Sequence, residues 1–248
     1  MMHWELCFFF FAVAMIYSSV GFGGGSSYIA LLSLYALPFK ELRLLALICN
    51  VVVVSGSVLV YWKNGLIDFK KVLPIVLTSV PLAYIGAMLR ISQTTFFVLL
   101  GCSLVVAALL LWVKKKQTEV ISKNDKSVKN VTIGGAIGFL SGMVGIGGGI
   151  FLSPILNLSK WDTPKKVAAT ASFFILVNSI AGIAGQLTQL PNDVNYTRIM
   201  VLVLSVFLGG QIGARFGAIK FNPLVVKRVT AVVVFAAGIN ILLKHWPL

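Results

Sequence analysis

Acidic residues are scarce in this chain of 248 residues, which has seven aspartates and glutamates against 21 lysines and arginines. Charged residues make up 11% of the chain and apolar residues 58%, whereas a soluble domain has roughly 25% and 45–50%. This composition excludes a soluble enzyme, a disordered chain and a fibrous protein. It predicts an all-α integral membrane protein that crosses the bilayer several times.

Histidine and cysteine are also rare. The two histidines, His3 and His245, lie at opposite ends of the chain, and Cys7, Cys49 and Cys102 lie inside apolar runs without a CxxC pair. We therefore expect no metal site and no cofactor, and we interpret the cysteines as small buried apolar residues. Because the sequence has no Ser–His–Asp arrangement, HExxH or Walker motif, catalysis is unsupported and no catalytic residue is proposed.

The net charge of +14 does not indicate nucleic-acid binding. The lysines and arginines sit in short connections between apolar runs, with no continuous basic stripe and no interleaved aromatic residues. We expect these charges to set the topology and to contact anionic lipid headgroups, so the expected partner is the lipid bilayer.

A glycine-rich segment occurs twice. Residues 19–25 (SVGFGGG) reappear 124 residues later as residues 143–149 (MVGIGGG). Each half then has a short apolar run, a basic connection and three long apolar spans, at 42–62, 70–90 and 94–113 and at 166–188, 197–217 and 223–244. The pattern predicts two repeats of about five apolar segments, residues 1–113 and 131–248, joined by a lysine-rich linker at 114–130.

The number of crossings predicts that the two repeats are inverted. In each repeat, the segments around the glycines form either two short spans or a re-entrant hairpin, so the chain returns to the side where it began. Three further spans follow, and this odd number of crossings places the second repeat upside down relative to the first. With the linker in the cytoplasm, sixteen basic residues fall at cytoplasmic ends and five at outer ends, as the positive-inside rule requires. We therefore expect a multi-pass protein of the cell (inner) membrane with both termini outside. The five outer residues are Lys40, Arg43, Arg90, Arg198 and Lys244.

The glycine runs are not dinucleotide fingerprints, because Ser26 and Ile150 stand where the third glycine of GxGxxG would fall. Close helix packing is one interpretation, since each run contains a GxxxG pair. Three consecutive glycines destabilise a helix by about 1 kcal/mol each, however, so we expect unwound backbone at both runs. Free N–H groups at the helices that follow would suit an anion. The ladders Gly134/Gly138/Gly142 and Gly209/Gly213/Gly217 are interpreted as close helix contacts.

Polar residues inside the spans are the remaining candidates for a site. They could simply bond across helices, but their grouping on matched spans beside the glycine runs favours a shared polar cavity. The acids lie near the ends of apolar runs or in connections, so the usual carboxylate site for a proton or cation is missing. Neutral donors and helix N-termini instead favour an anion. These residues are Asn50 in the first half and Thr170, Ser172, Asn178 and Gln211 in the second.

The second glycine run carries a family resemblance. Residues 145–149, followed by Pro154 and Leu156, read GxGGGxxxxPxL and resemble the hallmark of the sulfite exporter TauE/SafE family of membrane proteins. The first run departs from this motif, because Ala30 stands where Pro154 would align. The AxTxS run at 168–172 also resembles the second-half helix of the family, and the likeness extends along essentially the whole chain.

The resemblance implies a transporter that moves sulfite, organosulfonates or related small sulfur-containing anions, usually out of the cytoplasm. An alternating-access transporter is the leading interpretation; an anion channel and a non-transporting membrane scaffold subunit are the alternatives, and a homodimer is left open. The resemblance carries over to Gly23, Gly24, Gly25, Gly147, Gly148, Gly149 and Pro154. Matched positions add Ser26, Asn50, Thr170, Ser172, Asn178 and Gln211 to this predicted substrate site.

Overall fold

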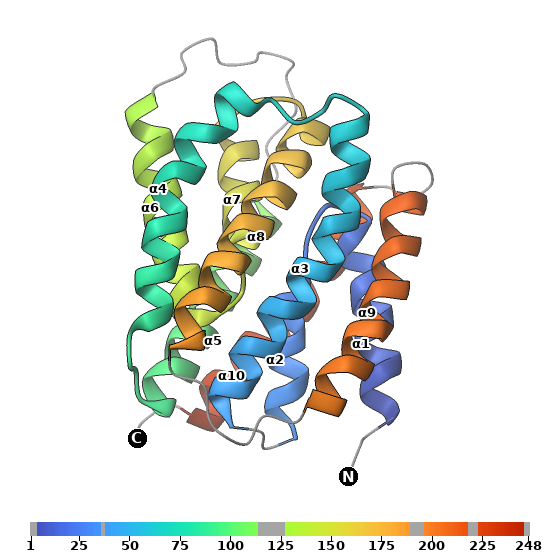
Figure 1. Cartoon of the computed structure of the whole chain (residues 1–248), viewed down its shortest axis with the longest axis vertical. Coiled ribbons are helices and arrows are strands. Elements are labelled where there is room, and N and C mark those ends of the chain that lie inside the picture. Colours follow the sequence, from blue (N-terminus) through green and yellow to red (C-terminus); the bar gives the residue numbers. More distant parts are fainter. Residues whose placement is uncertain (1–3, 36–37, 114–126, 189–195, 218–222, 246–248) are drawn as a thin grey trace.

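The computed structural model describes residues 4–35, 38–113, 127–188, 196–217 and 223–245, and within these ranges it contains helices and no strand. The all-α class predicted from composition is therefore confirmed. Figure 1 shows the helices in the order α1 (Trp4–Ser18), α2 (Gly25–Ser33), α3 (Phe39–Lys63), α4 (Phe69–Met88), α5 (Gln93–Trp112), α6 (Ser127–Val144), α7 (Gly149–Leu158), α8 (Pro164–Leu187), α9 (Tyr196–Gly217) and α10 (Pro223–His245).

Five helices in the described ranges, α3, α4, α5, α8 and α9, are long and apolar enough to cross a membrane. They coincide with five predicted spans, and α10 coincides with the sixth, at 223–244. The start of α6 at Ser127 falls inside the predicted linker, so its residues 127–130 are helical; residues 114–126 lie outside the described ranges.

Large apolar side chains cover much of the surface, as a lipid-facing exterior requires. Phe8 is 69% exposed, Leu77 64% and Met200 63%, on three different helices. Cys49 is buried as predicted, but Cys102 is exposed, which corrects our interpretation of all three cysteines as buried. The sequence could not distinguish the two, because lipid and protein interior are both apolar surroundings.

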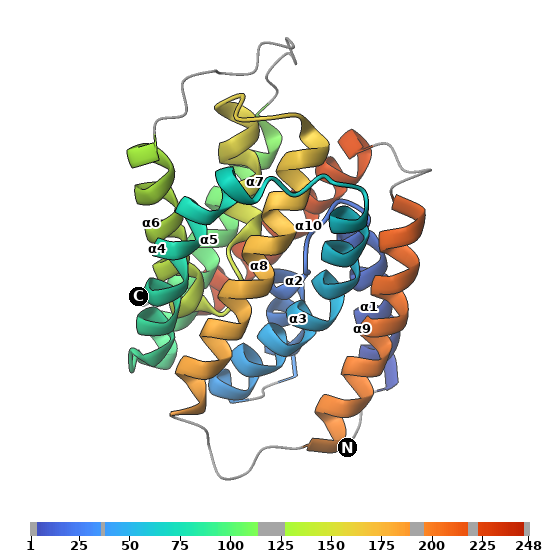
Figure 2. The ribbon, with the colours of Figure 1, turned by 45° about the horizontal axis from the view of Figure 1, so that its top comes forward.

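Two helices are too short to cross a bilayer. α2 has nine residues and α7 has ten, which is about 14 and 15 Å of helix against a hydrocarbon core of about 30 Å. Figure 1 shows that α1 rises from the lower end of the molecule and that the chain returns through α2 to that end, while α6 and α7 make the corresponding turn from the upper end. Figure 2 gives the same arrangement from a second direction.

The helix packing is matched between the two halves. α6 packs along α4 and α1 packs along α9, and in both pairs the contact is made at glycines. A Cβ on Gly138 would meet the backbone of Ser79, and one on Gly213 would meet the carbonyl of Met15. The interpretation of the glycine ladders as close helix contacts is confirmed at these positions.

The centre of the molecule is the contact between α3 and α8. α3 also packs against α9, and α8 packs against α4, so each central helix contacts the fourth helix of the other half. The short helices α2 and α7 lie against α3 and α8 respectively. Both glycine loops, residues 19–24 and 145–148, therefore reach the central helix pair.

Candidate functional site

The backbone is unwound at both glycine runs, as predicted. α1 ends at Ser18 and α2 begins at Gly25, and the corresponding break lies between Val144 and Gly149. The φ angle is +81° at Gly21 and +88° at Gly24 in the first loop, and +79°, +76° and +78° at three residues of the second: Gly145, Gly147 and Gly148. Side chains rarely adopt these angles, which explains why glycine stands at these positions.

Asn50 lies between the two glycine loops. Its Oδ1 accepts a hydrogen bond of 2.8 Å from the backbone N–H of Gly25, the first residue of α2. A Cβ on Gly23 would collide with the same side chain. On the other side, Asn50 Nδ2 lies 2.9 Å from the position that a Cβ on Gly147 would occupy. One amide on α3 therefore contacts both loops.

Ser179 on α8 approaches the second loop at the same residue, Gly147. Its Oγ lies 2.8 Å from the same Cβ position on Gly147. Ser179 Oγ and Asn50 Nδ2 are both buried without a hydrogen-bond partner, and both residues have 0% exposure. An unsatisfied buried polar group costs about 1–3 kcal/mol, so two of them beside one glycine make this point a candidate binding site.

Arg43 is a buried cation beside the second loop. It is 4% exposed, and a Cβ on Gly145 would lie 3.1 Å from Arg43 Cβ. Its Nη2 donates to the carbonyls of Gly142 at 3.0 Å and Ala87 at 3.5 Å, near the C-terminal ends of α6 and α4. Carbonyls at helix C-termini carry the negative end of the helix dipole, which favours a cation there.

The first loop makes the matching contact with α8. Ser172 Oγ donates to the carbonyl of Gly21 at 2.7 Å, and a Cβ on Gly21 would lie 2.9 Å from the carbonyl oxygen of Ala168. α3 begins 125 residues before α8, so Ala168 stands at the position of Arg43 in the other half.

The same offset shows that the polar centre is asymmetric. Ile175 on α8 corresponds to Asn50 on α3, and a Cβ on Gly149 would collide with Ile175 as a Cβ on Gly25 would collide with Asn50. One half therefore supplies an amide where the other supplies an apolar side chain. The contacts of the two loops are equivalent in space but different in chemistry.

The remaining predicted residues are only partly brought together. Ser26, Thr170 and Pro154 are buried, on α2, α8 and α7. Asn178 Nδ2 donates to Ser79 Oγ on α4 at 3.0 Å, so it faces a different neighbour from Ser179.

Gln211 lies away from the loops. Its side chain packs at Gly56 on α3, which is six residues, or about 9 Å along the helix, beyond Asn50. The structure thus gathers Gly23, Gly25, Asn50 and Gly147 and sets Gln211 apart from them.

Sequence reasoning missed Ser179 and counted Arg43 only as an outer charge. A signal for both was present, because residues seven positions apart lie on the same face of a helix. Arg43 and Asn50 are seven apart on α3, and Ser172 and Ser179 are seven apart on α8. Arg43 and Asn50 both contact the second loop from α3. On α8, Ser172 contacts the first loop and Ser179 contacts the second.

The unpartnered groups beside Gly147 are an amide N–H and a hydroxyl, both neutral. The amide of Asn50 and the hydroxyl of Ser179 lie at the N-terminal end of α7, where backbone N–H groups have no acceptor within the helix. Such groups suit an anion rather than a proton or a metal. Among the described residues no three histidines, cysteines or acids lie close enough together to hold a metal ion.

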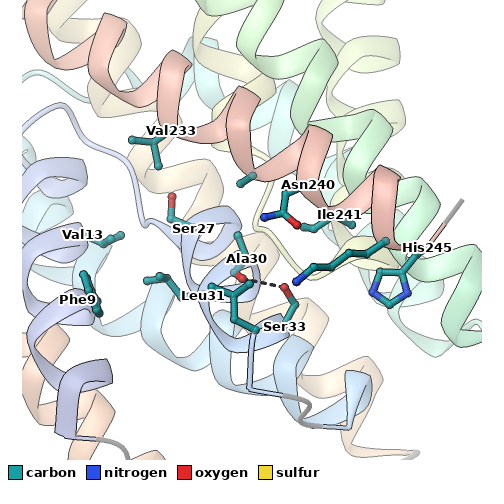
Figure 3. Close-up of a pocket in the computed structure, with 13 residues that line it drawn as sticks. Phe9, Val13, Ser27, Ala30, Leu31, Ser33, Val233, Asn240, Ile241 and His245 are labelled. Carbon is teal, nitrogen blue, oxygen red and sulfur yellow. Dashed lines mark hydrogen bonds between the residues drawn. The ribbon is translucent and has the colours of Figure 1, made fainter.

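A separate pocket of about 280 Å³ lies between α1, α2 and α10. Figure 3 shows Phe9 and Val13 of α1 on one side and Asn240, Ile241 and His245 of α10 on the other. Most of its lining is apolar, and none of the predicted site residues contributes to it.

The fold and the site define a class of protein. A bundle of apolar helices with two half-helices that begin at a buried polar centre is an architecture found in membrane transporters. The chain belongs to the sulfite exporter TauE/SafE family, which it matches over residues 6–241.

Three relatives are similar to the chain, and each is named a probable membrane transporter protein. The protein y4hK of Sinorhizobium fredii is 28% identical over 240 residues, which cover 94% of this chain and 95% of the relative. YunE of Bacillus subtilis is 28% identical over 187 residues, covering 66% and 67%. MJ0441 of Methanocaldococcus jannaschii is 25% identical over 167 residues, covering 63% and 62%. No solved structure matches the chain significantly.

Proposed function

We propose that this membrane transporter moves sulfite, an organosulfonate or a related small sulfur-containing anion out of the cytoplasm by alternating access. The observation that carries the proposal is the position of Asn50, which contacts the glycine loops ahead of both half-helices. Two helix N-termini and neutral donors at one buried point favour a small anion. The family description supplies the substrate class.

The proposal includes two inverted repeats, residues 1–113 and 131–248, with the linker in the cytoplasm and both termini outside. The matched helix pairs support it. α4 of the first half packs along α6 of the second half, and α9 of the second half packs along α1 of the first half. The entry of α1 and α6 from opposite ends of the molecule supports it as well (Figure 1).

The glycine contacts suggest how access could alternate. Where α6 lies on α4 and α1 lies on α9, the glycines let the backbones approach closely. A rigid-body shift at these contacts has to break few side-chain bonds, among them those from Ser18 Oγ to the Gly210 carbonyl and from Thr78 Oγ1 to the Val131 carbonyl. We propose that each short helix moves with α1 or α6 against the central pair and opens the site to one side at a time.

Counterflow in proteoliposomes tests this function. Vesicles containing the purified protein are preloaded with sulfite, thiosulfate or an alkanesulfonate, and uptake of the labelled anion is measured against protein-free vesicles. A transporter gives saturable uptake that accelerates with the same anion inside. Current without saturation or counterflow would indicate an anion channel, and no flux of any of these anions would indicate a scaffold subunit.

The predicted substrate residues have different roles in this proposal. Gly23, Gly25, Asn50 and Gly147 meet at one point and form its centre. The contacts of Ser172 and Asn178 hold neighbouring elements in place. Gln211 is expected to affect transport less than Asn50, because it lies about two turns along α3 from the loops.

A further inference from the structure

We infer that the anion is bound asymmetrically, by Asn50 Nδ2 and Ser179 Oγ over the second glycine loop at Gly147, while the first loop serves to orient Asn50. This inference rests on the proposed function and specifies the site within it. Ser179 enters as a binding residue that neither the sequence motif nor the family description assigns.

The orientation of the Asn50 amide follows from its partner on α2. The backbone N–H of Gly25 can only donate, so the atom that it contacts at 2.8 Å must be the amide oxygen. The amide nitrogen lies 2.5 Å from the position of a Cβ on Gly25 and 2.9 Å from that of a Cβ on Gly147, so it is placed between Gly25 and the second loop. The first loop therefore presents Asn50 as a donor to the second loop.

The two donors converge on one small region. Asn50 Nδ2 and Ser179 Oγ lie 2.9 and 2.8 Å from the same point beside Gly147, and neither has a partner. Both residues are completely buried, on α3 and α8. In this conformation the region is closed around the glycine, so an anion enters it when α7 and its loop move with α6 away from α3 and α8.

The chemistry of the region selects an oxyanion. Its unpartnered groups are an amide N–H and a hydroxyl, and the amide oxygen that a cation would need is engaged by Gly25. Arg43 lies seven residues before Asn50 on the same face of α3, about 10 Å away along the axis. Its buried charge adds a positive potential without being close enough to trap the anion. Sulfite and sulfonates present the several oxygens that two donors require.

Binding of radiolabelled sulfite to the purified full-length protein tests the inference. Ser179→Ala removes one donor at nearly constant size, and a lost hydrogen bond to a charged ligand corresponds to about 10- to 100-fold weaker binding. Asn50→Asp keeps an oxygen for Gly25 and places a second oxygen, in place of the donor, toward Gly147. We expect this variant to lose measurable binding through repulsion of the anion.

Two matched controls make the same chemical changes elsewhere, at Ser55 on α3 and at Asn64 directly after it. Ser55→Ala removes a hydroxyl that bonds only to the Val51 carbonyl of its own helix, and Asn64→Asp adds the same charge at the exposed end. Both should bind sulfite like the wild type. Size-exclusion profiles establish that each variant is folded, and Ser179→Ala decides alone if Asn50→Asp is not.

The outcomes separate the site from the function. If the wild type binds sulfite and Ser179→Ala binds equally well, the asymmetric site is wrong while the transporter proposal stands. If the wild type neither binds nor exchanges sulfite, thiosulfate or an alkanesulfonate, the proposed function itself fails and the site with it. Loss of binding in Ser55→Ala as well would also overturn the inference, because the effect would not be specific to Ser179.

Discussion

Lys71 Nζ on α4 lies 2.8 Å from Oδ2 of Asp162, a residue just before α8. At the other end of the molecule, Arg198 Nη1 on α9 lies 2.9 Å from Oε1 of Glu41 on α3. Lys71 and Arg198 are each the third residue of their helices. The two ion pairs thus occupy equivalent places in the two halves, where each ties an outer helix to the start of a central helix.

Acid should weaken the ion pair between Asp162 and Lys71. Burial raises the pKa of this carboxyl, but hydrogen bonds from Lys71 and the Thr163 N–H and the charges of Lys71 and Lys166 outweigh burial, so the pKa lies below its ordinary value. A lowered pKa in the folded state means stability that is present at neutral pH and lost as the pH falls through that value. Asp162→Asn should cost about 1 kcal/mol or less at pH 7. Thermal unfolding of both proteins should converge in acid, and a pH-independent difference would contradict the ion pair.

Gly148 should not tolerate a side chain. Its φ angle is +78°, and a Cβ there would lie 2.8 Å from Phe174 and 3.0 Å from Ile137 and Ser141. Gly148→Leu is expected to abolish transport while much of the protein still inserts. Gly65→Ala is the control, because Gly65 also has a positive φ but would meet nothing within 4 Å. Full counterflow by Gly148→Leu would reduce the second loop to a packing element.

Neighbouring glycines on α6 should differ sharply. A Cβ on Gly138 would meet the backbone of Ser79 at 2.6 Å or less, whereas one on Gly135 would meet the flexible end of Leu82. Gly138→Ala should therefore separate α4 from α6 and destabilise the protein by about 1–3 kcal/mol, and Gly135→Ala should have little effect. Thermal unfolding in detergent measures both, and equal behaviour would show that the α4–α6 contact is less tight.

The orientation can be tested at two exposed connections. Asn64 follows α3 and Arg90 follows α4, so they lie at opposite ends of one span. In a cysteine-free background, Asn64→Cys should react with a membrane-impermeant maleimide only after the cells are opened, and Arg90→Cys should react in intact cells. The reverse pattern would show that the protein has the opposite orientation in the membrane. Equal labelling of both residues from outside would contradict a membrane crossing between residues 64 and 90.

Membrane potential should drive export. Since the central site lacks a carboxylate to carry a proton, an inside-negative potential acts directly on the anion, by about 2.3 kcal/mol per charge per 100 mV. This corresponds to roughly a 50-fold ratio for a monoanion at equilibrium. Proteoliposomes with a potassium–valinomycin potential and matched pH and sodium measure the effect. Flux that ignores the potential but follows a sodium gradient would instead indicate a sodium ion held at the glycine loops.

Local patterns predicted the all-α fold and the breaks at the glycine runs. Span positions follow from runs of apolar residues, and the breaks at Gly23–Gly25 and Gly147–Gly149 follow from the cost of glycine in a helix. Asn50 was recognised because it is a polar residue on the span that follows the first glycine run. These inferences need only the residue and its neighbours in the chain.

The rotation of each helix could not be predicted. The spacing of Ser172 and Ser179 places them on one face of α8, but since lipid and neighbouring helices are equally apolar it does not show what that face contacts. Asn178 and Ser179 are adjacent in sequence but about 100° apart around the helix, and only the contacts show that Ser179 meets the loop while Asn178 meets α4. Arg43 was counted as an outer charge because a basic residue near the end of a span is usually exposed.

The exchange of Asn50 for Ile175 between the halves has a consequence for direction. If the two halves swap roles during transport, the inward-open and outward-open forms of the empty carrier contain the same helices with different chemistry at the open side. Their free energies then differ, so the empty protein rests preferentially in one of them. A carrier with such a resting bias has different half-saturation concentrations for the two directions of transport, although it produces no net flux when the anion is at equilibrium across the membrane.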